Sequence, residues 1–146
     1  MSDPLRLESQ LCFALHAASR AMTGAYQPLL DELGITYPQY LVLLLLWEED
    51  GSRVSHLGER LHLDSGTLTP LLKRLETHGL VERRRNTGDE RVVEVFLTAT
   101  GKRLKRRAMA VPAVMLCRTG LSIAELEKLR GTLQNLTKKL HETRER

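Results

Sequence analysis

Hydrophobic residues recur at helical spacing along most of this chain, and the pattern is clearest in its middle. One segment places leucines at the i, i+3, i+4 and i+7 positions of a single helix face: Leu68, Leu71, Leu72 and Leu75. A shorter segment before it repeats this spacing at Val54, Leu57 and Leu61. Between the two segments, Asp64-Ser65-Gly66 predicts a tight turn, because Asp and Ser cap helices and Gly tolerates unusual backbone angles. The pattern therefore predicts two short helices joined by a turn.

The polar face of the second helix has a distinctive order of residue types. Small residues come first and cations follow: Ser65, Gly66, Thr67, Thr69, Pro70, Lys73 and Arg74. Short side chains let a helix backbone approach base edges in a DNA groove, while Lys and Arg reach phosphates. Pro70 is awkward inside a helix because it lacks an amide hydrogen. Either the helix starts late, or this proline shapes the contact with the groove.

A basic hairpin is expected directly after this helix, which should end at Gly79. Residues 80–85 and 91–97 are the expected strands, the second of them rich in β-branched valines, and the loop between them, residues 86–90, contains a glycine. The cations of the hairpin are Arg83, Arg84, Arg85 and Arg91. A helix-turn-helix followed by a basic hairpin is the arrangement of a winged helix. A solvated hairpin beside an ordinary helix pair is the alternative, but the ordered combination of features favours DNA binding.

The first third of the chain predicts two helices. Asp3-Pro4 is a plausible start for the first, since Asp caps helices and Pro is tolerated at the first helical position. Residues 36–39, Thr-Tyr-Pro-Gln, have the pattern of a capping box that opens the next helix. Residues 40–47 are apolar on every side, which predicts a central buried helix.

The last third predicts further helices and a dimer. Thr98 should cap a helix that opens with the charge run at residues 101–107, which is either a solvated face or a weak phosphate contact. Pro112 should kink this helix, and Gly120 should end it. A final helix carries leucines in a 3-4-3-4 order, the spacing of a coiled-coil seam: Leu126, Leu129, Leu133, Leu136 and Leu140. Packing within one chain would also cover this seam, but a two-fold dimer built from both chain ends is the simplest outlet.

Composition is consistent with one domain, mainly α with a small antiparallel β wing. The chain has 146 residues, 42% of them hydrophobic, and a net charge of +4 that is concentrated between Lys73 and Arg107. Aromatic residues make up 4%, which disfavours a platform that stacks single-stranded bases. The start of the chain lacks the basic-then-apolar pattern of a signal sequence, and its longest apolar run is far below the roughly 20 residues that span a bilayer. We therefore expect a cytoplasmic protein without a membrane partner, whose two cysteines are thiols.

Longer stretches of the sequence resemble the MarR family of bacterial winged-helix regulators. The resemblance is carried by DSGTLTPLLKRLETHGLVERR at residues 64–84, DER at 89–91 and LTATGKRL at 97–104. QLCFAL at residues 10–15 and ITYPQYLVLLLLWE at 35–48 bring it closest to the branch that senses organic hydroperoxides (OhrR). The resemblance implies one MarR-like domain and a repressor rather than an enzyme. Residues 1–35 and 99–146 would form the dimer, and residues 36–98 would bind DNA.

The resemblance also implies roles for residues of the hairpin loop. In the family, an Asp-x-Arg places its Arg in the minor groove, and the Asp steadies that Arg through another basic residue. Asp89 and Arg91 occupy these positions here, with Arg84 or Arg85 as the candidate steadying partner. The dimer would set two recognition helices roughly 34–36 Å apart, to match a palindromic operator in double-stranded DNA.

Cys12 lies on or beside the apolar stripe of the first helix and, by itself, is most simply a buried inert thiol. The resemblance implies instead that Cys12 is the reactive thiol, stabilised as thiolate by the phenols of Tyr26 and Tyr37. If Cys12 and Tyr26 share one straight helix, the 14 residues between them span about 21 Å, so the phenols should come from the other subunit. The match further implies that Cys117, otherwise a small apolar filler, forms an intersubunit disulfide with oxidised Cys12.

The leading hypothesis is thus a homodimeric repressor that organic hydroperoxides release from DNA. A repressor of the same fold controlled by a small phenolic or drug-like ligand would keep its response after Cys12→Ser. A thiol peroxidase would turn over peroxide with a thiol reductant, although nothing else in the sequence resembles one. An architectural DNA protein would bind regardless of oxidation and with weak sequence preference. The His and Cys residues show no metal-ligand spacing, and no cofactor is expected.

Overall fold

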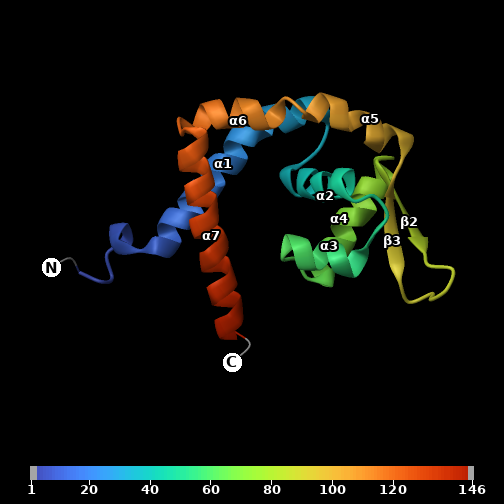
Figure 1. The fold of residues 1–146 in the computed structure, drawn as a ribbon, viewed down its shortest axis with the longest axis horizontal. Coiled ribbons are helices and arrows are strands. Elements are labelled where there is room, and N and C mark those ends of the chain that lie inside the picture. The colour runs from blue at the N-terminus through green and yellow to red at the C-terminus, as the bar shows by residue number, and fades with distance from the viewer. Residues whose placement is uncertain (1–2, 145–146) are drawn as a thin grey trace. The chain divides into compact units, whose positions relative to one another are not determined.

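A computed structural model of the protein describes residues 3–144, which are mainly helical with one small sheet (Figure 1). The chain divides into two compact units, the first ending at Met109 and the second beginning at Ala110. The elements of the first unit are the 3-10 turn η1 (Leu7–Ser9), α1 (Leu11–Leu33), α2 (Tyr37–Glu48), β1 (Ser52–Arg53), α3 (Val54–Leu61), α4 (Ser65–Thr77), β2 (Val81–Arg85), β3 (Val93–Leu97) and α5 (Ala99–Ala108). The second unit contains α6 (Val111–Thr119) and α7 (Ile123–Arg144).

The first helix begins later than the sequence predicts. Asp3 does not cap a helix; its carboxylate accepts a hydrogen bond from the amide of Leu5 in a turn, and α1 starts only at Leu11. The side chain of Gln10 donates to the carbonyls of Pro4 and Arg6 at 2.6 and 2.9 Å, which closes the segment before α1 into its own loop. From Leu11 onward α1 is one continuous helix of 23 residues.

The second helix confirms both predictions made for it. Thr36 and Gln39 form the predicted capping box, with each side chain bonded to the backbone amide of the other residue. Most of α2 is buried, including Tyr40, Val42, Leu43, Leu45 and Leu46. Trp47, at the end of α2, donates from its indole nitrogen to the carbonyl of Gly101 at 3.0 Å. This bond ties the central helix to α5.

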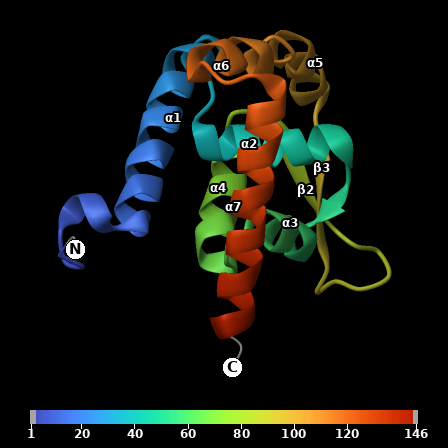
Figure 2. The ribbon, with the colours of Figure 1, turned by 60° about the vertical axis from the view of Figure 1, so that its left-hand side comes forward.

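The helix pair and hairpin predicted for the middle of the chain are present, with corrected boundaries. His78 is the C-cap of α4, one residue before the expected cap Gly79, which follows with a φ of +73°. Strand β3 begins at Val93, because Val92 still belongs to the loop: its carbonyl accepts from Asn86 and its amide donates to Asp89. In Figures 1 and 2 this loop projects beyond α3 and α4.

The sheet contains a strand that the sequence pattern did not reveal. Strand β1 is only two residues long, too short to show alternation, and it pairs with β3 to give the antiparallel order β1-β3-β2. Arg53 of β1 lies opposite Glu94 of β3, and Arg84 of β2 lies on the other side of the same Glu94. Because paired residues face the same side of a sheet, the three strands place these charged side chains on one face.

The end of the first unit and the second unit follow the predicted caps. Thr98 caps α5 by accepting from the amide of Gly101. The expected kink at Pro112 in one long helix is wrong. Helix α5 ends at Ala108, and Pro112 lies in the first turn of a separate helix, α6, where its missing amide costs nothing. Gly120 ends α6 as predicted. Ser122 and Glu125 form a further capping box at the start of α7.

Within residues 3–144, no single helix combines the length and apolar character needed to cross a membrane. Two pairs of consecutive helices, bent by 70° and 94°, meet that test by length and composition when each pair is taken together.

Candidate functional site

Helix α4 separates its residues into two faces as the sequence pattern predicts. The four leucines of the apolar stripe are all buried. The seven residues singled out on the opposite face are all exposed: Ser65, Gly66, Thr67, Thr69, Pro70, Lys73 and Arg74. Asp64 caps the helix by accepting a hydrogen bond from the amide of Thr67 at 2.7 Å, and this bond lowers the pKa of the Asp64 carboxyl. The exposed start of α4 is therefore a rigid, capped helical face.

Pro70 lies inside α4 rather than before it, which removes one of the two explanations for its position. The helix starts at Ser65 and continues through Pro70 to Thr77. Since proline has no amide hydrogen, the carbonyl of Gly66 cannot accept the usual helical hydrogen bond from residue 70. Both residues are exposed. The exposed face of α4 thus carries the carbonyl oxygen of Gly66, which does not accept the usual helical hydrogen bond.

The hairpin is fixed to α4 by Arg83. Its backbone amide donates to Oε2 of Glu76 at 2.9 Å, and its guanidinium donates to Oε1 of the same carboxylate at 3.2 Å. These bonds lower the pKa of Glu76, the backbone bond contributing most. Arg83 is consequently a structural residue that sets the angle between α4 and the hairpin.

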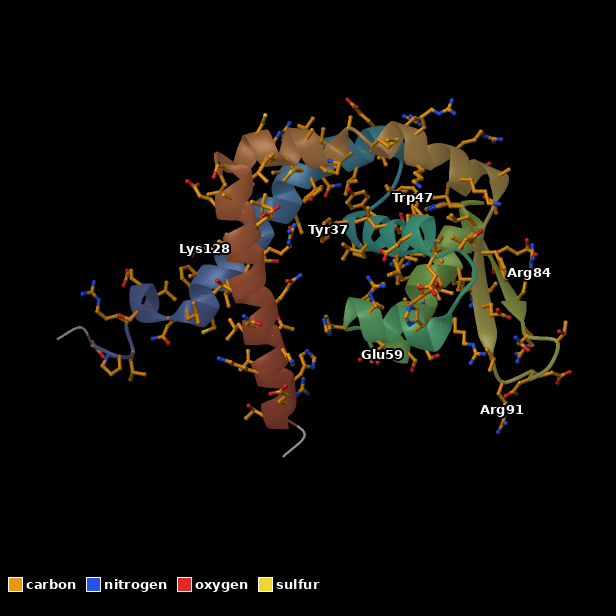
Figure 3. The ribbon with its side chains drawn as sticks, in the orientation of Figure 1. Tyr37, Trp47, Glu59, Arg84, Arg91 and Lys128 are labelled. Atoms are coloured by element: carbon orange, nitrogen blue, oxygen red, sulfur yellow. The ribbon has the colours of Figure 1, made fainter. Side chains whose placement is uncertain are left out.

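The two other arginines of β2 also have intramolecular partners. Arg84 forms two hydrogen bonds of 3.2 Å with Glu82, and its guanidinium lies 4.5 Å from the centre of the Phe96 ring. Figure 3 shows Arg84 on the side of the hairpin that faces away from the helices. Arg85 donates to the carbonyl of Glu90 at 2.9 Å. Arg84 therefore bonds to Glu82 and Arg85 to Glu90. The expected steadying role would require one of these two arginines to bond to Asp89 instead.

At the tip of the hairpin, Asp89 bonds directly to Arg91. Its carboxylate accepts from the backbone amide and from Nε of Arg91, at 3.1 and 3.2 Å. These bonds lower the pKa of Asp89, and the positive charge of Arg53 lowers it further. The basic residue that accompanies Asp89 thus comes from β1, which sequence reasoning missed because a two-residue strand leaves no pattern. The side chain of Arg91 is 92% exposed at the end of the hairpin (Figure 3).

Both cysteines are free and exposed, on α1 and α6 respectively. Cys12 is therefore not buried within its own chain, contrary to the simpler interpretation. Because α1 is continuous from Leu11 to Leu33, Tyr26 lies about 21 Å along the helix axis from Cys12 of the same chain. The expected thiolate donors are therefore not assembled beside Cys12 within α1.

Tyr26 and Tyr37 come together, as their expected shared role requires. Their ring centres are 5.1 Å apart, although one lies on α1 and the other on α2. Tyr40, which sequence reasoning treated only as a core residue, contacts both rings, at 5.7 and 6.4 Å. Burial raises the pKa of all three phenols, and mutual repulsion of their negative forms adds to the shift for Tyr26 and Tyr40. All three consequently remain protonated hydrogen-bond donors at neutral pH.

Among residues 3–144, no group of three or more His, Cys, Asp or Glu side chains is arranged to hold a metal ion.

Comparison with known proteins identifies relatives of this chain over most of its length. The family described as transcriptional regulator SarA/Rot matches residues 25–108. The organic hydroperoxide resistance transcriptional regulator of Bacillus subtilis is 51% identical over 140 residues, covering 96% of this chain and 95% of the relative. The structure of reduced AbfR bound to DNA, a protein of Staphylococcus epidermidis, matches with a TM-score of 0.81 and 35% identity, covering 95% of each chain. The disulfide-formed structure of AbfR matches with a TM-score of 0.64 and 36% identity, covering 97% and 94%.

Proposed function

Because this chain belongs to the SarA/Rot-type regulators of the winged-helix MarR family, we propose that it is a dimeric repressor that senses organic hydroperoxides. Transcriptional regulation through DNA binding is the activity of its relatives. The proposal adds the signal, which is oxidation of Cys12, and the response, which is release of a palindromic operator.

The single observation that carries the proposal is the separation of Cys12 from its phenols along α1. Cys12 is exposed near the start of the helix, and the Tyr26–Tyr37 pair lies about 21 Å further along it. In a two-fold dimer in which the α1 helices run antiparallel, the start of one helix lies beside the far part of the other. Each phenol pair would then donate to Cys12 of the partner subunit, so that the sensor exists only in the dimer.

Each of the two units carries exposed apolar side chains that such a dimer would cover. Leu11 and Phe13 on α1 are 63% and 41% exposed, and Leu129 and Leu140 on α7 are 49% and 57% exposed. No residue of α7 within the described part of the chain is buried. Dimers are typical of the family, and residues 1–35 and 99–146 are the segments we assign to dimerisation.

The chemistry of the switch consists of two steps that balance without a cofactor. The Cys12 thiolate attacks the outer oxygen of the hydroperoxide; the O–O bond breaks, and the leaving alkoxide takes a proton to give the alcohol, leaving a sulfenic acid on Cys12. The thiolate of Cys117 from the partner subunit then attacks that sulfur; the S–O bond breaks, a disulfide forms, and the leaving hydroxide takes a proton to give water. A dithiol reductant reverses the switch. AbfR, for which structures of the reduced form bound to DNA and of the disulfide form are both known, provides the parallel.

DNA would be held by two elements from each subunit. The exposed face of α4 would enter the major groove, with Lys73 and Arg74 at phosphates, and Arg91 at the hairpin tip would enter the minor groove beside Asp89. Arg84 and Arg85 would add positive charge along the hairpin. Oxidation would release DNA by changing the spacing of the two subunits, since a hundredfold loss of affinity needs only about 2.7 kcal/mol of differential binding.

The test is non-reducing electrophoresis beside a DNA-binding assay, with and without an organic hydroperoxide. We expect a dimer-sized band that appears as DNA binding disappears, and both changes should be reversed by a dithiol. Cys12→Ser should bind DNA and ignore the hydroperoxide, while Cys117→Ser should lose the dimer-sized band. A Cys12→Ser protein that still leaves DNA in response to a phenolic compound would instead favour control by a small ligand.

A further inference from the structure

All three tyrosines of this protein lie in one cluster, and one of them has no assigned role. Tyr26, Tyr37 and Tyr40 are the complete set in the sequence, and every pair among them is in ring contact. Tyr26 and Tyr37 are partly exposed, whereas Tyr40 is only 3% exposed. Tyr40 is thus the buried member on which the two more accessible rings rest.

We propose that Tyr40 is a positioning residue of the sensor, whose ring holds the phenols of Tyr26 and Tyr37 in place to donate to Cys12 of the partner subunit. The inference rests on the proposed function, and it concerns a residue that touches neither the thiol nor the hydroperoxide.

The geometry favours the ring of Tyr40 as the active group. Tyr40 follows Tyr37 by three residues, so both lie on one face of α2, while Tyr26 reaches the cluster from α1. The Tyr40 ring centre is 5.7 Å from that of Tyr26 and 6.4 Å from that of Tyr37, with tilts of 44° and 41°. Both distances lie within the range of roughly 4.5–7 Å over which aromatic rings interact favourably. The ring of Tyr40 therefore limits the rotamers of a phenol on each of two helices.

Restriction of these rotamers has a direct effect on the thiolate. A hydrogen bond stabilises a charged acceptor only to the extent that its favourable free energy exceeds the entropic cost of ordering the donor. Phenols that already rest against a buried ring lose little further freedom when they donate. With a flexible residue at position 40, both phenols would have to be ordered at the moment the thiolate forms, and less thiolate would be present at a given pH.

The experiment measures how fast Cys12 is alkylated by iodoacetamide as a function of pH, in full-length dimers carrying Cys117→Ser so that one thiol reports. Tyr40→Phe keeps the ring and should leave the midpoint of the profile unchanged. Tyr40→Leu and Tyr40→Met remove the ring and should raise the midpoint by about one pH unit, which is a tenfold fall in the ratio of thiolate to thiol at a given pH. Oxidation by an organic hydroperoxide, measured at a pH below the midpoint, should slow by a similar factor.

Leu46→Ala is the matched control, because Leu46 is a fully buried residue of the same helix that forms no part of the tyrosine cluster. It should lower stability and leave the alkylation profile unchanged. DNA binding by the reduced variants identifies those that fold, and the two ring-removing substitutions differ in shape so that the comparison does not depend on one of them. Tyr40→Phe, which keeps the ring, should have the wild-type midpoint of the alkylation profile.

Two results would overturn the inference. In the first, a folded Tyr40→Leu or Tyr40→Met dimer has the wild-type midpoint; in the second, Tyr40→Phe shifts the midpoint as far as those variants do. Failure of the proposed function has a different signature: Tyr26→Phe and Tyr37→Phe would then leave the wild-type profile unchanged.

Discussion

Arg91→Ala is expected to weaken DNA binding strongly without changing the stability of the fold. The Arg91 side chain is 92% exposed and its ion pair with Asp89 lies at the surface, so its removal should alter the free energy of unfolding by less than about 0.5 kcal/mol. On DNA, an arginine contact is worth roughly 1–3 kcal/mol, and a dimer loses two of them. We therefore expect a loss of about 3 kcal/mol, or roughly a hundredfold in affinity.

The assay is fluorescence anisotropy with a duplex selected for tight binding by the wild-type protein, repeated at several salt concentrations. Two cations lost per dimer should make the slope of log affinity against log salt shallower by about 2. Arg106→Ala is the charge-matched control: Arg106 is exposed on α5, which follows the end of β3 opposite to the hairpin loop. If Arg91→Ala loses no more affinity than Arg106→Ala, the placement of the hairpin tip in the minor groove is wrong.

Three substitutions test the fold, and a titration tests the tyrosine cluster. Thr98→Ala removes the side chain that accepts from Gly101 and donates to the carbonyl of Gly79, and should cost about 1 kcal/mol in urea unfolding. Gly101→Ala should lower the free energy of unfolding by more than about 2 kcal/mol, because its new methyl group meets the backbone carbonyl of Leu80. Gly131 has open space around it, so Gly131→Ala should instead stabilise α7 by up to about 1 kcal/mol. Burial raises the pKa of Tyr40 to about 12, so the folded state keeps a proton that the unfolded chain loses near pH 10. The stability from this phenol is therefore present below about pH 10 and lost as pH rises toward 12. The ultraviolet absorbance of tyrosinate reports the ionisation directly. A Tyr40 ionisation midpoint at the ordinary tyrosine value would contradict the burial of this residue.

Helix starts illustrate how far local sequence can be interpreted. Three predicted caps are confirmed, at Thr36, Asp64 and Thr98, and each accepts a hydrogen bond from an amide three residues away. The prediction at Asp3 used the same chemistry and was wrong. There the carboxylate bonds two residues ahead, and no residue of the adjoining 3-10 turn is buried. A cap residue permits a helix, but burial of an apolar face is needed to select it.

The helix boundaries near the two prolines show the same limit of prediction from local sequence. Pro70 and Pro112 both suggest a disturbed helix, yet α4 runs through the first and α6 begins around the second. The leucines flanking Pro70 are buried, which offsets the hydrogen bond that proline removes. Near Pro112 the chain instead divides into α5 and α6. The outcome depends on what each helix packs against, and that information is not local.

The sequence by itself determined which face of α4 is buried and which is exposed, because a period of 3.6 residues fixes the direction of every side chain on a helix. It also determined the hairpin and most helix ends, since these depend on contacts a few residues apart. Tertiary structure alone decided that Arg83 bonds to Glu76, that Arg53 lies near Asp89, and that Tyr40 supports two phenols from different helices. Periodicity gives the direction of a side chain from its own element but not the element it meets, because that depends on how separate helices and strands dock.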